Sequence, residues 1–254
     1  MAGWGSAASA TRGGLRRDAF FFSEERLYAS MYRSVPPGRG PALVLCPSWG
    51  HEMFGTLPLC YRMARRLAES GGAGLLVHWP GHGDSGGEPE RTDLERMAAA
   101  AEQALGEARR RVPEPPWGIA GVRLGAAAAT LAAVRAEAAA LLLIRPALDP
   151  GRYFAELERA SRRAGLGRVH GRPWAFGHPL PDVRSKPDVQ AALAGFSGPA
   201  ACMGYESDPP GPPAGELEAK RVPGSWESGM KARHGALVDA MLAWTLSSLE
   251  PVRA

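Results

Sequence analysis

Residues 117–133, WGIAGVRLGAAAATLAA, combine a short apolar strand, a glycine-flanked turn and a small-residue helix. Such a turn is typical of the G-x-S-x-G elbow, in which a serine attacks an acyl group. The next backbone N–H, here that of Leu124, then stabilises the oxyanion. Arg123 stands in the serine's place, and a guanidinium stays protonated and is no nucleophile. The sequence predicts an altered elbow, and the alternative is an ordinary strand-to-helix turn.

Arg123 needs an anionic partner. It would place a cation at the positive end of a helix dipole, which costs about 0.3–1 kcal/mol if the charge is unpaired. A bound carboxylate or phosphate would satisfy both the helix N–H groups and the guanidinium fork. A side-chain carboxylate would serve as well, so the sequence predicts either an anionic ligand or an internal ion pair.

The elements that must position this turn follow a regular alternation. Predicted strands cover residues 41–49, 73–81, 117–122, 140–146, 199–205 and 216–223, and predicted helices cover 57–70, 93–112, 124–140 and 235–249. Alternating strands and helices predict an α/β fold, a mainly parallel sheet flanked by helices on both faces. A hairpin over residues 19–41 is expected to extend one edge of that sheet.

The remaining segments suggest one domain with an insertion. Residues 1–18 are expected to form a flexible N-terminal tail, and residues 19–254 a single domain. Between residues 147 and 197 the alternation breaks, after the sixth predicted strand. An insertion there would lie over the carboxyl ends of the strands, where open α/β sheets bind ligands. We therefore predict a small cap, whose aromatic and histidine side chains form its own core or select an acyl chain: Tyr153, Phe154, His170, Trp174, Phe176 and His178.

Composition argues against several classes of function. The 30 basic residues exceed the 26 acidic ones only slightly and form no basic block, so nucleic acid is not an expected partner. No apolar run approaches the ~20 residues of a membrane span, and the first seventeen residues lack the apolar core of a signal peptide. Three scattered cysteines fit no metal spacing and indicate free thiols in a reducing cytoplasm. With no dinucleotide fingerprint present, we expect a cytoplasmic protein without metal or cofactor, and the Arg, Ala, Gly and Pro usage is typical of a high-GC bacterial genome.

The order of the motifs resembles that of an α/β-hydrolase over roughly residues 40–250. CPSWGHEM (46–53), GHGDSGG (81–87), the elbow and a late acidic loop follow one another as in that superfamily. The chain is most similar to serine-aminopeptidase-like hydrolases, and within them to exosortase A system-associated hydrolases of the second type. That narrower resemblance is carried by GVRLGA (121–126), RPALDPGRYFAELERA (145–160) and PGSW (223–226). It implies a sheet of about eight strands, the usual number in the superfamily.

The resemblance also assigns positions to the catalytic triad. It places Asp208 in the position of the triad acid and Trp226 in the slot of the catalytic histidine. Arginine is long enough to span the missing histidine, so we predict an Arg123–Asp208 ion pair, with Glu52 as a second partner for Arg123. The alternative for Asp208 is a solvated turn residue. His234 is a candidate displaced base or a surface histidine near a helix end, and Trp226 an apolar pocket face or ordinary packing.

Two further loops are interpreted with the help of the resemblance. Ser48, Trp49, His51 and Glu52 would line the pocket on the oxyanion loop, together with Arg123, Leu124 and Trp226. Ser48 is also a candidate substitute nucleophile if His51 reaches it as a base. In GHGDSGG, which also contains His82 and Ser85, the resemblance implies a structural loop in which Asp84 accepts backbone N–H bonds.

Two functions therefore remain open. The chain is either an inactive or non-standard hydrolase with a degenerate triad, which binds a small acyl or anionic ligand, or it is an active ester, thioester or amide hydrolase with a non-standard nucleophile. The residue chemistry favours the first function, because two of the three triad positions hold unsuitable side chains. Besides the ligand, a second copy of the chain in a homodimer is a candidate partner.

Overall fold

The main sheet has nine strands among the residues that the computed structural model describes, which are 6–165, 168–169, 172–175, 178–179, 187–208, 217–231 and 234–249. The order across the sheet is β1-β2-β3-β5-β4-β6-β7-β11-β12. The strands are β1 (Ser6–Arg12), β2 (Leu15–Phe22), β3 (Leu27–Ser34), β4 (Ala42–Cys46), β5 (Ala73–Val77), β6 (Trp117–Val122), β7 (Leu141–Ile144), β11 (Ala200–Tyr205) and β12 (Glu218–Val222). From β5 to β12 all neighbours run parallel, which confirms the predicted α/β fold.

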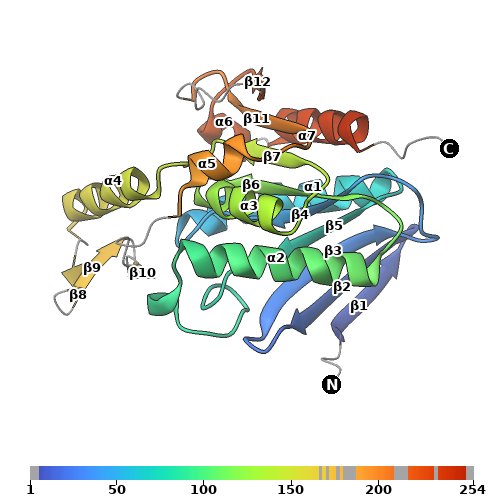
Figure 1. The fold of residues 1–254 in the computed structure, drawn as a ribbon, viewed down its shortest axis with the longest axis horizontal. Coiled ribbons are helices and arrows are strands. Elements are labelled where there is room, and N and C mark those ends of the chain that lie inside the picture. The colour runs from blue at the N-terminus through green and yellow to red at the C-terminus, as the bar shows by residue number, and fades with distance from the viewer. Residues whose placement is uncertain are drawn as a thin grey trace.

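Helices cover both faces of this sheet (Figure 1). They are α1 (Glu52–Glu69), α2 (Leu94–Arg111), α3 (Leu124–Arg135), α4 (Pro150–Arg163), α5 (Val189–Ala194), α6 (Trp226–Lys231) and α7 (Gly235–Ser248), with a short 3-10 helix, η1 (Pro89–Arg91). Along β4, Val44 packs with residues of α2 and α3, whereas Leu43 and Leu45 pack with α1 and α7. Strands buried on both faces read as continuous apolar runs, which is why the sequence predicts β4, β5, β6 and β7 so directly.

The first three strands are antiparallel and form one edge of the sheet. β2 and β3 pair along their whole length, as the predicted hairpin requires, and β3 pairs with β5. The expectation of a flexible tail over residues 1–18 is wrong for residues 6–18, because β1 pairs with β2 and the first residues of β2 pair with β3. Ser, Ala, Thr and Arg side chains at these positions show no apolar alternation, so only the pairing partner defines this edge strand.

The segment from 147 to 197 contains α4, a small antiparallel sheet and α5. The sheet has the order β10-β9-β8, with β8 (Arg168–Val169), β9 (Arg172–Ala175) and β10 (His178–Pro179). Figure 1 shows α4 and this sheet beside the main sheet. The side chains of His170, Trp174, Phe176 and His178 lie outside the described residues. Tyr153 and Phe154 of α4 are buried in the core that α2 and α3 share.

Candidate functional site

The turn between β6 and α3 holds Arg123 in a strained conformation. Its φ is 56° and its ψ is −121°, a backbone geometry that costs a non-glycine residue about 1–3 kcal/mol. The Arg123 N–H donates to the Ile144 carbonyl at 3.0 Å, and the Arg123 carbonyl accepts the N–H groups of Ala126 and Ala147 at 3.0 and 3.1 Å. The end of β7 and the first turn of α3 thus hold the strand-to-helix turn in place, as a nucleophile elbow requires.

Two glycines allow α3 to begin this close to the sheet. A Cβ on Gly121 would lie 2.3 Å from the Gly125 carbonyl oxygen, and a Cβ on Gly125 would lie 2.0 Å from that of Pro47. Leu124, the first residue of α3, is fully buried. The first amides of a helix have no partner within it, so α3 begins with N–H groups that can stabilise an anion.

The side chain of Arg123 contacts Glu52, the first residue of α1. Arg123 Nε lies 3.5 Å from Glu52 Oε2, and the guanidinium carbon lies 5.3 Å from the centre of the Tyr153 ring. The same Oε2 accepts hydrogen bonds from Ser48 Oγ at 2.7 Å and from Tyr153 Oη at 2.8 Å. Glu52 therefore joins the elbow, the loop after β4 and α4, and it is the second of the two predicted partners of Arg123.

The predicted Arg123–Asp208 ion pair is wrong. Asp208 Oδ1 lies 2.8 Å from Nε of Arg145, and Asp208 Oδ2 accepts the N–H of Tyr205 at 2.7 Å. The Asp208 side chain is only 4% exposed, so it is not a solvated turn residue either. Arg145 directly follows β7, the strand beside β11, and is therefore nearer to the loop that carries Asp208.

Arg145 lies among the candidate site residues, although the sequence pattern did not single it out. Its φ of 46° marks a second strained turn, and its guanidinium carbon lies 5.2 Å from the centre of the Trp226 ring. Burial lowers the pKa of Arg145, and the positive charge of Arg123 lowers it further, although Asp208 opposes both effects. An arginine directly after the apolar run ALLLI was the available signal, since it ends a parallel strand next to the elbow.

His234 is buried rather than on the surface. It is 1% exposed, its Nδ1 hydrogen-bonds to Tyr205 Oη at 2.8 Å, and its ring lies 4.5 Å from that of Trp226. Burial and the charge of Arg62 lower the pKa of His234, so the ring is neutral at pH 7. Trp226 and His234 thus share one cluster, but the recorded partner of the histidine is a tyrosine hydroxyl rather than a triad acid or nucleophile.

Ser48 is paired with an acid and not with the expected base. It is fully buried, its N–H donates to Thr56 Oγ1 at 3.1 Å, and its hydroxyl donates to Glu52. His51 precedes α1, and burial lowers its pKa. Trp49 packs edge-on against Phe154, with 5.4 Å between the ring centres. The oxyanion loop is therefore fixed by α1 and α4.

The GHGDSGG loop is structural, but Asp84 is not the residue that holds it. The Asp84 carboxylate is largely exposed, and the Asp84 N–H donates to His78 Nδ1 at 3.1 Å. Ser85 Oγ donates to the His78 carbonyl at 2.8 Å and accepts the N–H of Tyr28 at 2.9 Å. The hydroxyl serves this turn because it both donates and accepts, whereas a carboxylate only accepts.

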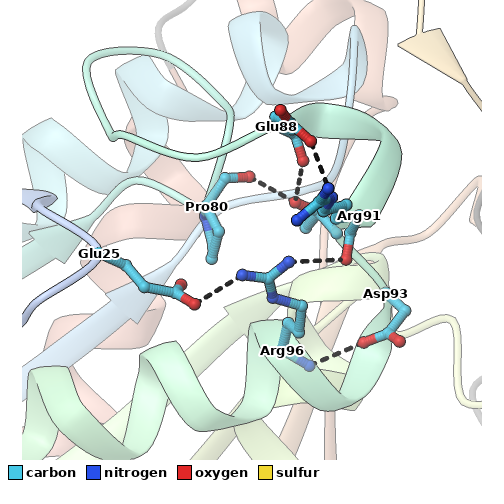
Figure 2. Close-up of polar contacts among 7 residues, drawn as sticks. Glu25, Pro80, Glu88, Arg91, Asp93 and Arg96 are labelled. Carbon is cyan, nitrogen blue, oxygen red and sulfur yellow. Dashed lines mark hydrogen bonds and ion pairs between the residues drawn. The ribbon is translucent and has the colours of Figure 1, made fainter.

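Charged contacts fix the chain that follows this loop (Figure 2). Arg96 donates to Glu25 at 2.6 Å and to the Arg91 carbonyl at 3.3 Å, while its own N–H is capped by Asp93 at 2.9 Å. Burial also lowers the pKa of His82, whose Nδ1 contacts the Pro80 carbonyl. The His82 ring also packs against Trp49, with 5.7 Å between the ring centres, so this turn borders the oxyanion loop.

Thiol and metal chemistry find little support among the described residues. Burial raises the pKa of Cys60 to about 12 and raises that of Cys46 well above its ordinary value, so neither forms a thiolate nucleophile readily. In the described part of the chain, no group of three His, Cys, Asp or Glu side chains could hold a metal ion. None of the helices described is both long and apolar enough to cross a membrane.

Comparison with known proteins identifies the fold. No family model and no curated protein matches the chain. Among solved structures, it is similar to a proline iminopeptidase from Mycobacterium smegmatis, at a TM-score of 0.63 and 11% identity, covering 90% of this chain and 97% of that one. It is similar to Est1E from Butyrivibrio proteoclasticus with ferulic acid bound, at 0.59 and 16%, covering 96% and 100%. An alpha-beta serine hydrolase homologue from Coxiella burnetii matches at 0.58 and 15%, covering 89% and 95%. The chain therefore has the α/β-hydrolase fold.

Proposed function

We propose that this protein binds the carboxylate of an acyl ligand at the altered elbow and does not hydrolyse esters through an elbow nucleophile. The observation that carries the proposal is Arg123 in the strained elbow conformation, at φ 56° and ψ −121°. Strain of this kind persists at sites where the surrounding structure over-determines it, and such sites are often functional. An arginine held there offers a charged fork in the place of a nucleophile.

Three features suit a carboxylate. Glu52 approaches Nε of Arg123, and no hydrogen bond is recorded between the terminal N–H groups of Arg123 and the other described residues. Those groups remain for a ligand, and a carboxylate accepts such a fork in bidentate geometry. The adjacent N-terminus of α3 adds a favourable dipole. The buried rings of Trp49, Tyr153 and Phe154 pack together, and the Tyr153 ring lies beside Arg123, so the surroundings of the charged fork are apolar.

A second candidate function is hydrolysis of an ester, thioester or amide by a non-standard nucleophile. The contact that favours it is the 2.7 Å hydrogen bond from Ser48 Oγ to Glu52, because a carboxylate can accept the proton of an attacking hydroxyl. Two observations oppose it. Ser48 is fully buried, and Glu52 is already shared with Tyr153 and Arg123.

The proposal includes membership of a narrower family within the α/β-hydrolases. The sequence GVRLGA places arginine at the elbow, as the resemblance to exosortase A system-associated hydrolases of the second type implies. Membership would place the ligand in a bacterial cytoplasm beside exopolysaccharide and protein-sorting systems. A homodimer is compatible with this role, and light scattering on the purified protein tests it.

Calorimetric titration with hexanoate tests carboxylate binding. We expect binding by the wild type and by Arg152→Ala, and at least tenfold weaker binding by Arg123→Ala. Arg152 is a suitable control because it is largely exposed on α4 and pairs with Glu156. Equal affinities in all three proteins would overturn the proposed ligand site.

Hydrolysis is measured on the same proteins with p-nitrophenyl hexanoate and a hexanoyl thioester. We expect no turnover above the uncatalysed rate in the wild type or in Ser48→Ala. Turnover in the wild type that is absent from Ser48→Ala would establish the second function instead.

A further inference from the structure

A cavity of about 140 Å³ lies at the end of the sheet opposite the elbow. It is formed by the end of β3, the turn that follows, the start of β5 and the chain after α2. Arg33 of β3 pairs with Ala73, the first residue of β5, whereas the elbow follows the last residue of β6. In Figure 1 the C-terminal end of α2 and the turn after β3 lie at the right, and α4 lies at the left. This cavity is therefore separate from the site described above.

Arg33, which lines the cavity, is held by a buried acid. Its Nε lies 3.4 Å from Oδ2 of Asp18, which is 5% exposed. The other oxygen of Asp18 accepts a 2.9 Å hydrogen bond from Arg16. Burial would raise the pKa of Asp18, but hydrogen bonds from Ser9 and Arg16 and the charges of Arg16 and Arg33 outweigh burial and lower it. Asp18 thus stays ionised and attracts Arg33 through an ion pair, without a hydrogen bond to Nε.

Arg111, at the end of α2, lines the same cavity and is also paired with an acid through Nε, here by a hydrogen bond that Nε of Arg33 lacks among the described residues. Its Nε donates to Glu107 Oε1, and its guanidinium carbon lies 3.5 Å from the centre of the Phe20 ring. Glu107 is also bound by Arg110. An arginine anchored through Nε and stacked on a ring presents its two terminal nitrogens as a preorganised fork. For both Arg33 and Arg111, no bond from those terminal nitrogens is recorded within the described part of the chain.

We propose that this cavity binds a small monocarboxylate between Arg33 and Arg111. Carboxylates match the guanidinium fork, and two forks on one cavity hold both oxygens. Glu114 also lines the cavity, so the lining carries one net positive charge and disfavours a dianion. The remaining wall includes Pro37, Pro113 and Pro115, which have no N–H to donate and suit a short apolar body.

Titration with propionate tests this site, with propionamide as the uncharged analogue. All titrations use full-length protein carrying Arg123→Ala, so that the elbow does not contribute. We expect propionate to bind and propionamide not to bind. Arg33→Gln and Arg111→Gln should each weaken propionate at least tenfold.

Two neighbouring arginines provide matched controls. Arg16 binds the same acid as Arg33, and Arg110 the same acid as Arg111, but neither lines the cavity. Arg16→Gln and Arg110→Gln should therefore leave propionate affinity within about twofold. Equal weakening by the controls, equal binding of propionamide, or tighter binding of phosphate than of propionate would each overturn the proposal. Arg33→Gln removes a partner of Asp18 and could prevent folding. In that case the propionate affinities of Arg111→Gln and Arg110→Gln are compared, and equal affinities overturn the proposal.

Discussion

Arg123 combines two local costs that the fold must offset. Its φ of 56° is unfavourable for any residue with a Cβ, and its charge lies at the N-terminus of α3. The ion pair with Glu52 reduces the second cost and leaves the first untouched. Under the proposed function, ligand binding rather than stability explains why an arginine stands at this position.

The first prediction separates backbone strain from side-chain function. Arg123→Gly and Arg123→Ala both remove the guanidinium, but only glycine adopts a positive φ at no steric cost. We expect Arg123→Gly to be more stable than Arg123→Ala by about 1 kcal/mol in urea denaturation, since strain relief exceeds the loss of chain entropy. Both variants should lose hexanoate binding. A more stable alanine variant would contradict the strained geometry.

The second prediction concerns competition between Glu52 and the ligand. Glu52→Gln keeps the side-chain shape and two hydrogen bonds but removes the negative charge that Arg123 contacts. A partly exposed ion pair is worth about 1 kcal/mol or less, so hexanoate should bind up to about fivefold tighter to the variant. Calorimetric titration with hexanoate measures this change. Glu69→Gln is the control, because it removes an exposed ion pair with Arg65 on the same helix and should leave hexanoate affinity unchanged. Weaker hexanoate binding would mean that Glu52 contacts the ligand or organises the site.

At the scale of elements, local pattern predicts the central strands but misplaces the start of α1 and misses β1. The sequence places the start of this helix at residue 57, five residues too late, because Gly55 and Pro58 resemble helix breakers, yet both lie inside α1, which begins at Glu52. The pairing of β1 with β2 depends on backbone bonds, which no side-chain pattern along residues 6–12 reveals.

The site residues, too, are predicted from sequence where they depend on local spacing and are missed where they depend on the order of the strands. GVRLG predicts the strained turn because the glycine spacing is local: Gly121 lets α3 lie close to β6, and Gly125 lets α3 lie close to the loop after β4. Which cation reaches Asp208 depends on the order of strands in the sheet. Only the adjacency of β7 and β11 makes Arg145 its partner instead of Arg123.

The third prediction tests the close packing of α3. Gly125→Ala would place a Cβ 2.0 Å from the Pro47 carbonyl oxygen, so α3 must move away from the oxyanion loop. Overpacking of this kind costs about 1–3 kcal/mol. Gly106→Ala in α2 is the control, since nothing lies within 4 Å of its added Cβ, and it should stabilise by about 0.5–1 kcal/mol. Thermal unfolding of both variants measures the difference, and equal melting temperatures would contradict the packing.

At the scale of the whole molecule, the two proposed arginine-based sites lie at opposite ends of the strands. Arg123 and Arg145 follow the carboxyl ends of parallel strands, where α/β folds place their ligands. Arg33 and Arg111 lie where those strands begin. At both ends a carboxylate holds a guanidinium through Nε and leaves the terminal nitrogens for another group. The sheet, rather than any one loop, keeps the two sites apart.

The last prediction follows from histidines distributed through the core and the loops. Burial lowers the pKa of His51, His78, His82 and His234 below the ordinary 6.5. As the pH falls below 6.5 the unfolded chain binds protons that the folded chain does not, so stability is complete above pH 6.5 and declines as the pH falls through the lower folded-state values. The urea concentration at the midpoint of unfolding should therefore be lower at pH 5.5 than at pH 7.5.

One histidine allows this explanation to be checked directly. His78 accepts the Asp84 N–H through Nδ1, and the Oδ1 atom of an asparagine can accept the same bond without titrating near neutral pH. His78→Asn should therefore show a smaller fall in the urea midpoint than the wild type over the same pH range. The depressed pKa values of Asp18 and Glu107 do not interfere, because carboxylates of this kind lose their stabilising effect only as the pH falls below about 4. Among the pKa shifts described, only those of the histidines change protonation between pH 7.5 and pH 5.5. An equal urea midpoint of the wild type at both pH values would therefore show that the buried histidines do not control stability in this range.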